Sequence, residues 1–346
     1  MRTGSLEDAF RSLEADVSTV VRELGELKDK HTVLSATVQD WKEAASLPKG
    51  NVLSAVPGSS GPGAVPASQC QTMQEQYYRQ NKETFHGDDA KALFLRVVGK
   101  YFPTPCGRSG ETTAVIDVGA NTGQDVKYFS KWFGAGQSCR SKIYLFEPNP
   151  QVVKYSLQPR AAKYAETEII QGAVSNFTGE QQFYTNVDAS SKKNEQGSLG
   201  KIHWMKGGTS FPVPTYTLDN FVDEKGIAYI PFLKVDAEGW EGAVFQGGGR
   251  KALKMTDFVF FECSDTLDDS RGTGHKLKDI VGYLDAAGFE VYKIGTRYML
   301  KMNGPYWHDV YDRIRYWSNC MAVSSTLQQH LRPRWLDGRN RSMVLC

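Results

Sequence analysis

Apolar residues recur at alternating steps of four and three along the first part of the chain. This spacing continues over about five heptads, which is typical of a coiled-coil seam. A helix that packs on its own domain is the alternative, but its 3.6-residue stripe would drift over this length. We therefore expect a coiled-coil helix over residues 1–47, with self-association through residues 6–41. The seam consists of Leu6, Phe10, Leu13, Val17, Val20, Leu24, Leu27, His31, Leu34, Val38 and Trp41.

Residues 48–69 lack this periodicity and are rich in proline, glycine and serine. Such a composition is that of a flexible linker. From Cys70 onward apolar and polar residues are mixed as in a globular protein, so we expect one folded domain over residues 70–346.

Runs of strand-type residues alternate with helix-type segments through this domain. The alternation predicts a parallel sheet with helices on both faces. The expected strands are Ala114–Val118, Lys142–Glu147, Glu168–Val174, Ile230–Asp236, Asp257–Glu262, Phe289–Ile294 and Tyr316–Val323, with Glu180–Thr185 as a short extra strand. The expected helices are Thr122–Phe133, Pro150–Leu157, Trp240–Gln246 and His275–Ala287.

Composition narrows the class of protein. The net charge of +2 gives no basic field for nucleic acid, and six scattered cysteines without a C-x-x-C pair match neither a zinc site nor a dense disulfide framework. We find no apolar run long enough to span a membrane and no signal-type apolar core. These features predict a cytoplasmic protein, with a secretory-pathway enzyme that has lost an anchor as the alternative.

Acidic residues stand at the ends of four predicted strands. Ligands of open α/β sheets bind beyond the carboxyl ends of the strands. Because each acid follows a run of apolar residues, we expect this edge of the sheet to bind a ligand. The four acids are Asp117, Glu147, Asp236 and Glu262.

The stretch AVIDVGANTG combines the first of these acids with a glycine loop, Gly119-x-x-x-Gly123. The loop departs from the dinucleotide fingerprint G-x-G-x-x-G, and Asp117 would repel a pyrophosphate. It would attract an ammonium group, which a glycine loop lets approach closely. Glu147 can accept both hydroxyls of a ribose. An amino acid at one end and a ribose at the other indicate S-adenosylmethionine.

The segment FLKVDAEGWEG adds Asp236, which is expected beside the sulfonium. Glu238 and Glu241 follow closely. The competing interpretation is that Glu238 caps the next helix and that Lys234 or Glu241 only solvates this segment.

The motifs VIDVGANTG, FEPNP, GAVSN, TLDNF, LKVDAEGWEGAVFQGG and FVFFEC occur in the order found in the FkbM family of S-adenosylmethionine-dependent methyltransferases, which the chain resembles from about residue 112 to 294. The resemblance implies a class I methyltransferase fold, Rossmann-like, with a seven-stranded, mostly parallel sheet whose last strand is antiparallel. It implies O-methylation of a hydroxyl on a sugar, glycan or natural product.

The resemblance also implies roles for individual residues. Asp236 would lie near the methyl group. Glu147 would hold the ribose. The methionine part would be held by Asp117, Gly119, Asn121 and Gly123, and the adenine would lie by Ala173, Val174 and Ser175.

A hydroxyl acceptor has to lose a proton, so a base within hydrogen-bond reach is expected. We take Asp236 and His203 as the catalytic candidates, because His203 lies in a long aperiodic loop of the kind that covers binding sites. His275 and His308 are further candidates. A divalent metal held by Asp236 together with Glu238 and Glu262 is an alternative. No spacing demands it, so we predict none.

Two other classes of protein stay open. A non-catalytic oligomeric scaffold could keep the fold without the chemistry, although the intact Asp117, Gly119 and Asp236 argue against it. A nicotinamide dehydrogenase is disfavoured by the loop pattern.

Overall fold

The computed structural model describes residues 66–89, 91, 112–134, 141–185, 197–200, 208–263, 274–314, 316–325 and 327. The predicted coiled coil over residues 1–47 lies outside these ranges, as do most of the predicted linker and His203. These three expectations stay predictions.

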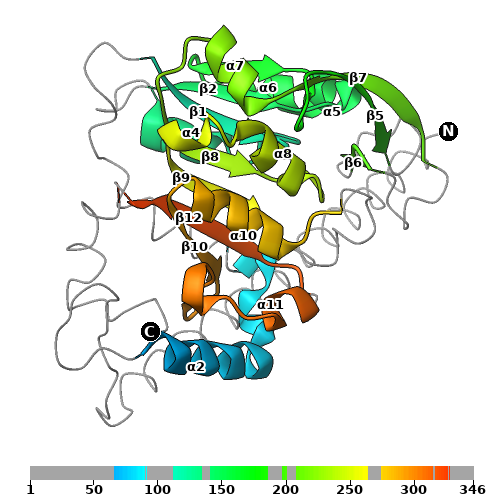
Figure 1. Cartoon of the computed structure of the whole chain (residues 1–346). Coiled ribbons are helices and arrows are strands. Elements are labelled where there is room, and N and C mark those ends of the chain that lie inside the picture. Colours follow the sequence, from blue (N-terminus) through cyan, green and yellow to red (C-terminus); the bar gives the residue numbers. More distant parts are fainter. Residues whose placement is uncertain are drawn as a thin grey trace, which may run out of the picture. The chain divides into compact units, whose positions relative to one another are not determined.

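One sheet of eight strands forms the centre of the described domain, in the order β11-β10-β12-β9-β8-β1-β2-β3 (Figure 1). The five strands from β9 to β3 are parallel, and β12 runs antiparallel to both of its neighbours. The strands are β1 Thr113–Val118, β2 Lys142–Phe146, β3 Thr167–Ile170, β8 Tyr229–Val235, β9 Thr256–Glu262, β10 Phe289–Ile294, β11 Met299–Lys301 and β12 Asn319–Ser324.

The expected mostly parallel sheet is thus present, but the expected number of seven strands is wrong for the described residues. The eighth strand is β11, which forms an antiparallel hairpin with β10 at the edge of the sheet. The chain turns between them with a hydrogen bond from Gly295 N to Tyr298 O at 3.0 Å. Met299 and Leu300 are buried, so this short apolar pair extends the sheet and its core.

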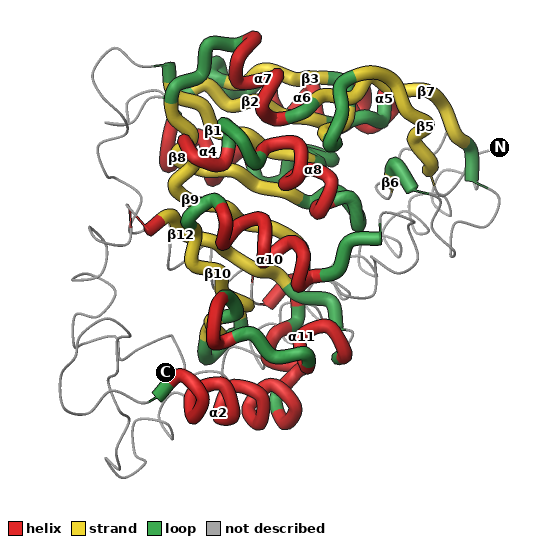
Figure 2. Tube along the Cα trace, in the orientation of Figure 1, coloured by secondary structure: helices red, strands yellow, loops and turns green. Residues whose placement is uncertain are grey.

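Helices cover both faces of the sheet, and Figure 2 shows them as red segments on the yellow strands. Alternate residues of a strand point to opposite faces. Ile116 of β1 therefore joins the apolar cluster under α7, α8 and α10, whereas Val115 joins the cluster under α4 and α6. The helices are α4 Val126–Phe133, α5 Pro150–Val152, η2 Val153–Leu157, α6 Gln158–Ala161, α7 Leu218–Glu224, α8 Glu241–Gly248, η3 Leu253–Met255 and α10 Leu277–Ala286.

A second, four-stranded sheet in the order β4-β7-β5-β6 follows β3 in the chain. The sequence had predicted one strand over Glu168–Val174, which is wrong: β3 ends at Ile170 and the chain changes sheets at Gly172. A Cβ at Gly172 would lie 2.8 Å from Pro214 O, so glycine allows the backbone to cross against β7. The strands are β4 Ala173–Val174, β5 Gly179–Thr185, β6 Gly197–Ser198 and β7 Ser210–Tyr216.

The part of the domain before β1 begins three residues earlier than the predicted Cys70. Its buried rings of Tyr78 and Phe85 meet edge to face, with centroids 5.2 Å apart, and Tyr78 also contacts Tyr311. Near the end of the chain, Cys320 forms a disulfide with Cys263 at the end of β9. The remaining helices are α2 Ala67–Gln80, η1 Lys82–Phe85, η4 Gly304–Tyr306 and α11 Val310–Arg313.

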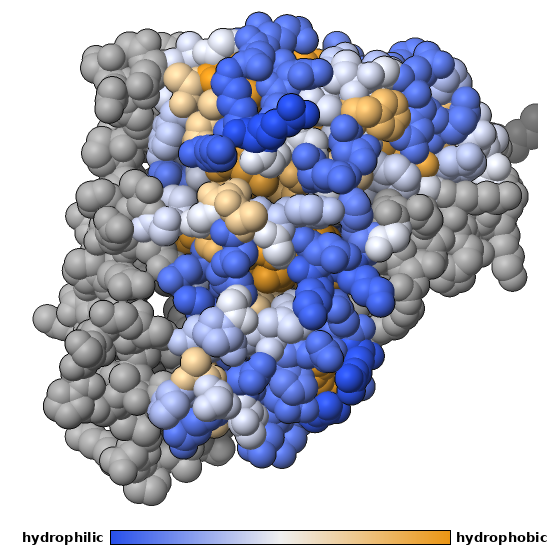
Figure 3. Space-filling view, in the orientation of Figure 1, coloured by the Kyte–Doolittle hydropathy of each residue, from blue (hydrophilic) through white to orange (hydrophobic). Residues whose placement is uncertain are grey.

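The outer surface of the helix layer formed by α7, α8 and α10 is mostly hydrophilic, with apolar side chains showing in patches between the helices (Figure 3). Within the described residues, every helix is too short or too polar to cross a bilayer.

Candidate active site

The acidic residues that the sequence placed at strand ends reach one edge of the main sheet. A cleft opens there between this edge and the second sheet, with an empty volume of about 720 Å³ that includes its open mouth. The cleft is lined by Val118, Gly119, Asn121, Gln124, Phe146, Glu147, Pro148, Asn149, Gly172, Ala173, Val174, Phe183, Gly197, Leu199, Asp236, Ala237, Glu238 and Trp240.

Six of the predicted site residues therefore line a single cleft. Three others, Asp117, Gly123 and Ser175, are adjacent to the lining in sequence but are not among the lining residues. His275 and His308 are also outside the lining, and His308 Nε2 pairs with Glu75 Oε2 of α2 at 2.8 Å. The six lining residues are Gly119, Asn121, Glu147, Ala173, Val174 and Asp236.

The loop after β1 is held in a left-handed conformation at three positions. Gly119, Asn121 and Gly123 have φ angles of 78°, 48° and 75°. A Cβ at Gly119 would lie only 1.9 Å from the carbonyl oxygen of Asp236. The glycine is therefore needed both for its φ angle and for the close approach of the loop to the end of β8. The left-handed φ angle of Gly123 is incompatible with an α-helix, so the helix expected from Thr122 begins only at Val126.

Glu147 follows β2 and is buried beside this loop. Its carboxylate accepts hydrogen bonds from the backbone N–H groups of Asn121 at 2.9 Å and Asn149 at 2.8 Å. Burial raises the pKa of Glu147 to about 7, although these two N–H donors oppose the shift. A carboxylate has about four acceptor sites, so two of them stay available for a diol in the cleft.

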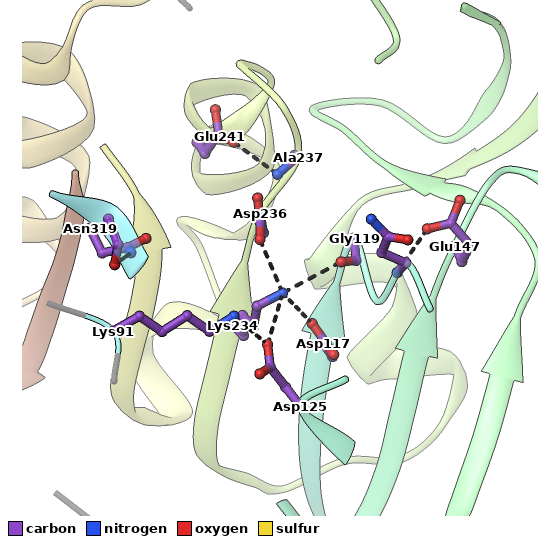
Figure 4. Close-up of polar contacts among 12 residues, drawn as sticks. Lys91, Asp117, Gly119, Asp125, Glu147, Lys234, Asp236, Ala237, Glu241 and Asn319 are labelled. Carbon is purple, nitrogen blue, oxygen red and sulfur yellow. Dashed lines mark hydrogen bonds and ion pairs between the residues drawn. The ribbon is translucent and has the colours of Figure 1, made fainter. Parts of the chain in front are cut away.

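Asp117 is fully buried, and one of its carboxylate oxygens forms an ion pair within the protein. Lys234 Nζ on the neighbouring β8 donates to Asp117 Oδ1 at 3.1 Å (Figure 4). The sequence alone had assigned the partner of Asp117 to a cationic ligand. The other oxygen, Oδ2, is buried and has no hydrogen-bond partner among the described residues. Burial raises the pKa of Asp117, and the ammonium group of Lys234 opposes this shift.

Asp125 precedes α4 and joins Asp117, Lys91 and Lys234 in one group of charged side chains. Lys91 Nζ lies 2.8 Å from Asp125 Oδ2, and Lys234 Nζ lies 3.7 Å from the same oxygen. Burial alone would raise the pKa of Asp125, but the two ammonium groups outweigh it and hold the pKa below its usual value.

The loop from Asp236 to Glu241 is stabilised by a hydrogen bond between its own side chain and backbone. Glu241 accepts a hydrogen bond from Ala237 N at 2.8 Å, so this buried acid fixes the loop before α8. Glu241 thus has a structural role in this loop, but it is buried, so the expected solvation is wrong. Glu238 has a φ angle of 52° and lines the cleft.

Carboxylate oxygens of Asp236, Glu238 and Glu262 lie within 4.8 Å of one another. This spacing is compatible with a divalent cation, but acidic groups often lie this close without one, and Glu262 is buried outside the cleft lining.

The cleft has an aromatic and apolar wall that the sequence did not predict. Phe183 of β5 and Leu199 after β6 come from the second sheet. Trp240 packs against this cluster, and its Nε1 donates to Ser175 Oγ at 2.9 Å. Ser175, predicted to lie by the adenine, therefore orients the indole ring. Trp240 belongs to the K-x-D-x-E-G-x-E motif, and an aromatic residue beside the predicted acids was the available signal.

Comparisons with known proteins agree on one kind of enzyme. Residues 117–291 match the family model described as the methyltransferase FkbM domain. The 2-O-methyltransferase NoeI of Sinorhizobium fredii (strain NBRC 101917 / NGR234) is 24% identical over 160 residues, which are 44% of this chain and 63% of that relative. The match thus spans less than two thirds of the relative's own length.

Two solved structures are similar to the chain. Methyltransferase FkbM from Methylobacillus flagellatus KT has a TM-score of 0.37 and 14% identity, over 73% of this chain and 58% of that one. Precorrin-6y C5,15-methyltransferase from Geobacter metallireducens GS-15 has a TM-score of 0.33 and 11% identity, over 67% and 87%.

Proposed function

The chain belongs to the FkbM methyltransferase family, and on that premise we propose that it is an S-adenosylmethionine-dependent O-methyltransferase acting on a hydroxyl of a sugar, glycan or natural product. One observation carries the proposal. A single cleft is lined by Gly119 and Asn121 of the glycine loop, by Glu147 and by Asp236, the residues that we assign to the amino acid, the ribose and the acceptor. The similarity to a 2-O-methyltransferase supports an oxygen acceptor.

The cofactor's amino-acid part would lie on the loop after β1. There the backbone approaches without side chains, and Asp117 Oδ2 is a buried oxygen that an ammonium group could use. Glu147 would accept the ribose hydroxyls through its two remaining acceptor sites. Ala173 and Val174, with Phe183 and Leu199 across the cleft, form an apolar slot suited to an adenine ring.

When bound, the cofactor supplies a methyl group already activated by a positively charged sulfur. Asp236 and the cleft walls would align the acceptor oxygen and exclude water from it. In the transfer, the bond between acceptor oxygen and methyl carbon forms as the bond between sulfur and methyl carbon breaks. Asp236 accepts the proton of the hydroxyl. His203, whose position is outside the described residues, is the second candidate for this base.

The test is methyl transfer from isotopically labelled cofactor to a panel of free sugars, glycans and lipid extracts. We expect one class of hydroxyl acceptor to be labelled, and Asp236→Asn to abolish labelling while the affinity for cofactor stays within about tenfold. Asp223→Asn, at an exposed acid on α7, is the matched control. If cofactor binds but no acceptor is labelled, the non-catalytic scaffold gains support. Normal turnover by Asp236→Asn would contradict the role of Asp236.

A further inference from the structure

Lys234 is a buried lysine that contacts both the acid proposed for the cofactor, Asp117, and the acid proposed for the acceptor, Asp236. Its side chain is only 5% exposed, and its Nζ lies 3.1 Å from Asp117 Oδ1 and 3.3 Å from Asp236 Oδ2 (Figure 4). It also donates to the carbonyl oxygen of Gly119 at 3.4 Å. One ammonium group therefore contacts the acid before the glycine loop, the loop itself and the acid proposed as base.

The sheet explains how these groups meet. Lys234 and Asp236 are two residues apart on one chain segment, so they point to the same face of the sheet. Asp117 is the register partner of Lys234 on the neighbouring strand β1. Parallel pairing thus places the three side chains together on the face that α4 covers.

The charges in this group do not balance. Three carboxylates, Asp117, Asp125 and Asp236, face two ammonium groups, those of Lys91 and Lys234. With all of them ionised, the group carries one uncompensated negative charge. An excess of negative charge beside the cleft attracts a cationic ligand, the more so where burial excludes water.

Lys234 contacts one oxygen of Asp117 and one oxygen of Asp236, and the second oxygen of each acid is left for other partners. Asp117 uses Oδ1 for Lys234, and its Oδ2 has no hydrogen-bond partner in the described part of the chain. Asp236 uses Oδ2 for Lys234, and its side chain is 34% exposed at the cleft. Asp236 therefore presents its other oxygen to the cleft, whereas Asp117 Oδ2 is a buried oxygen next to the lining in sequence.

We propose that Lys234 is a positioning residue that fixes the cofactor acid Asp117 and the acceptor acid Asp236 relative to each other through one buried ammonium group. This inference rests on the proposed function. It adds that the two sites share a cation, so disturbing Lys234 affects cofactor binding as well as the orientation of the base.

The experiment compares three variants of the full chain by calorimetric titration with S-adenosylhomocysteine. Lys234→Met removes the ammonium group and keeps a similar side-chain length, and we expect the affinity to fall at least about thirtyfold. Lys234→Arg keeps the positive charge and should recover most of that loss. Lys225→Met is the matched control: it removes an ammonium group from Glu168, which is outside the cleft lining, so its affinity should stay within about threefold.

Lys234→Met leaves the three carboxylates with only Lys91 as a counterion, so we expect a fraction of the variant protein to be unfolded. Unfolded molecules lower the stoichiometry of the titration, whereas lost positioning raises the dissociation constant of the folded ones. The double variant Lys234→Met/Asp125→Asn restores the original charge balance and should fold better, yet still bind weakly. Wild-type affinity in the double variant, or an equal loss in Lys234→Arg and Lys234→Met, would overturn the proposal. Failure of the wild-type chain to bind at all would instead overturn the proposed function.

Discussion

Glu147 connects the chemistry of the cleft to pH. Its pKa is raised from 4.5 to about 7 by burial, opposed by the N–H groups of Asn149 and Asn121. Asp117 and Lys234 are the charged groups that act on it from the neighbouring strands. In the ligand-free protein, this raised pKa contributes stability that is present below the ordinary pKa and is lost as pH rises through about 7.

Ribose hydroxyls that donate to Glu147 would favour its charged form. Binding should therefore release a proton below pH 7, and the affinity for S-adenosylhomocysteine should fall by up to about tenfold for each pH unit below that point. Titration calorimetry in two buffers of different ionisation enthalpy measures the proton release. Glu147→Gln cannot ionise and should lose this pH dependence. Equal dependence in the variant and the wild type would show that another group titrates.

The acids and glycines of the site could be predicted from the sequence. Asp117, Glu147 and Asp236 each end a run of apolar residues, which makes a buried carboxylate conspicuous. Lys234 was missed because a lysine beside acids was taken as solvation, although the K-x-D spacing places both charges on one face of a strand. Phe183 and Leu199 carried no signal, because only the fold of the second sheet brings them to the cleft.

The loop after β1 depends on Gly119 for its shape. Ala at this position would meet the carbonyl oxygen of Asp236 at 1.9 Å and would also carry a positive φ. Gly226 has a similar φ of 61° but open space around it, which makes it a matched control. We expect Gly226→Ala to cost only the ~1–2 kcal/mol of a left-handed residue.

Gly119→Ala should destabilise the protein by clearly more than Gly226→Ala and should abolish binding of S-adenosylhomocysteine. Chemical denaturation gives the free energy of unfolding of both variants, and titration gives their affinities. Equal stabilities of the two variants would mean that the loop does not pack on β8 as described.

Strands with continuous apolar runs were predicted well. The observed bounds of β1, β2, β8 and β9 agree with the expected ones to within one residue at each end. The second sheet was not predicted as a sheet. Its β4 has two residues, and β7 carries Pro212 and Pro214, which argue against a strand. Its pairing of β4 with β7 joins segments about forty residues apart, which no local pattern encodes.

The disulfide between Cys263 and Cys320 joins β9 to β12 beside the acid edge of the sheet. Disulfides persist in oxidising compartments, so this bond favours the secretory-pathway alternative over the cytoplasmic expectation. Mass spectrometry of the denatured, alkylated protein should find these two thiols protected without reductant. Cys263→Ser/Cys320→Ser should lower the free energy of unfolding by ~2–4 kcal/mol.

Cys70→Ser is the control for loss of a buried sulfur, because Cys70 is buried and is not part of the Cys263–Cys320 bond. Alkylation of Cys263 and Cys320 in protein purified without reductant would contradict the disulfide.

The predicted coiled coil over residues 1–47 would make the full chain an oligomer. His31 at a seam position would place like charges together on protonation, so the assembly should loosen below about pH 6.5. Light scattering on the full chain and on a chain that starts at residue 66 compares the two states. We expect an oligomer and a monomer, both able to bind cofactor. A monomeric full chain at micromolar concentration would show that the heptads do not associate.

The central claim is that the cleft binds S-adenosylmethionine through Asp117 and Glu147. Calorimetric titration of the full chain with S-adenosylhomocysteine tests it most directly. We predict one site per chain and a loss of roughly 1.5–3 kcal/mol of binding free energy in Asp117→Ala and in Glu147→Ala, each of which removes a hydrogen bond to a charged group. No binding by the wild type, or unchanged affinity in Asp117→Ala, would contradict the account.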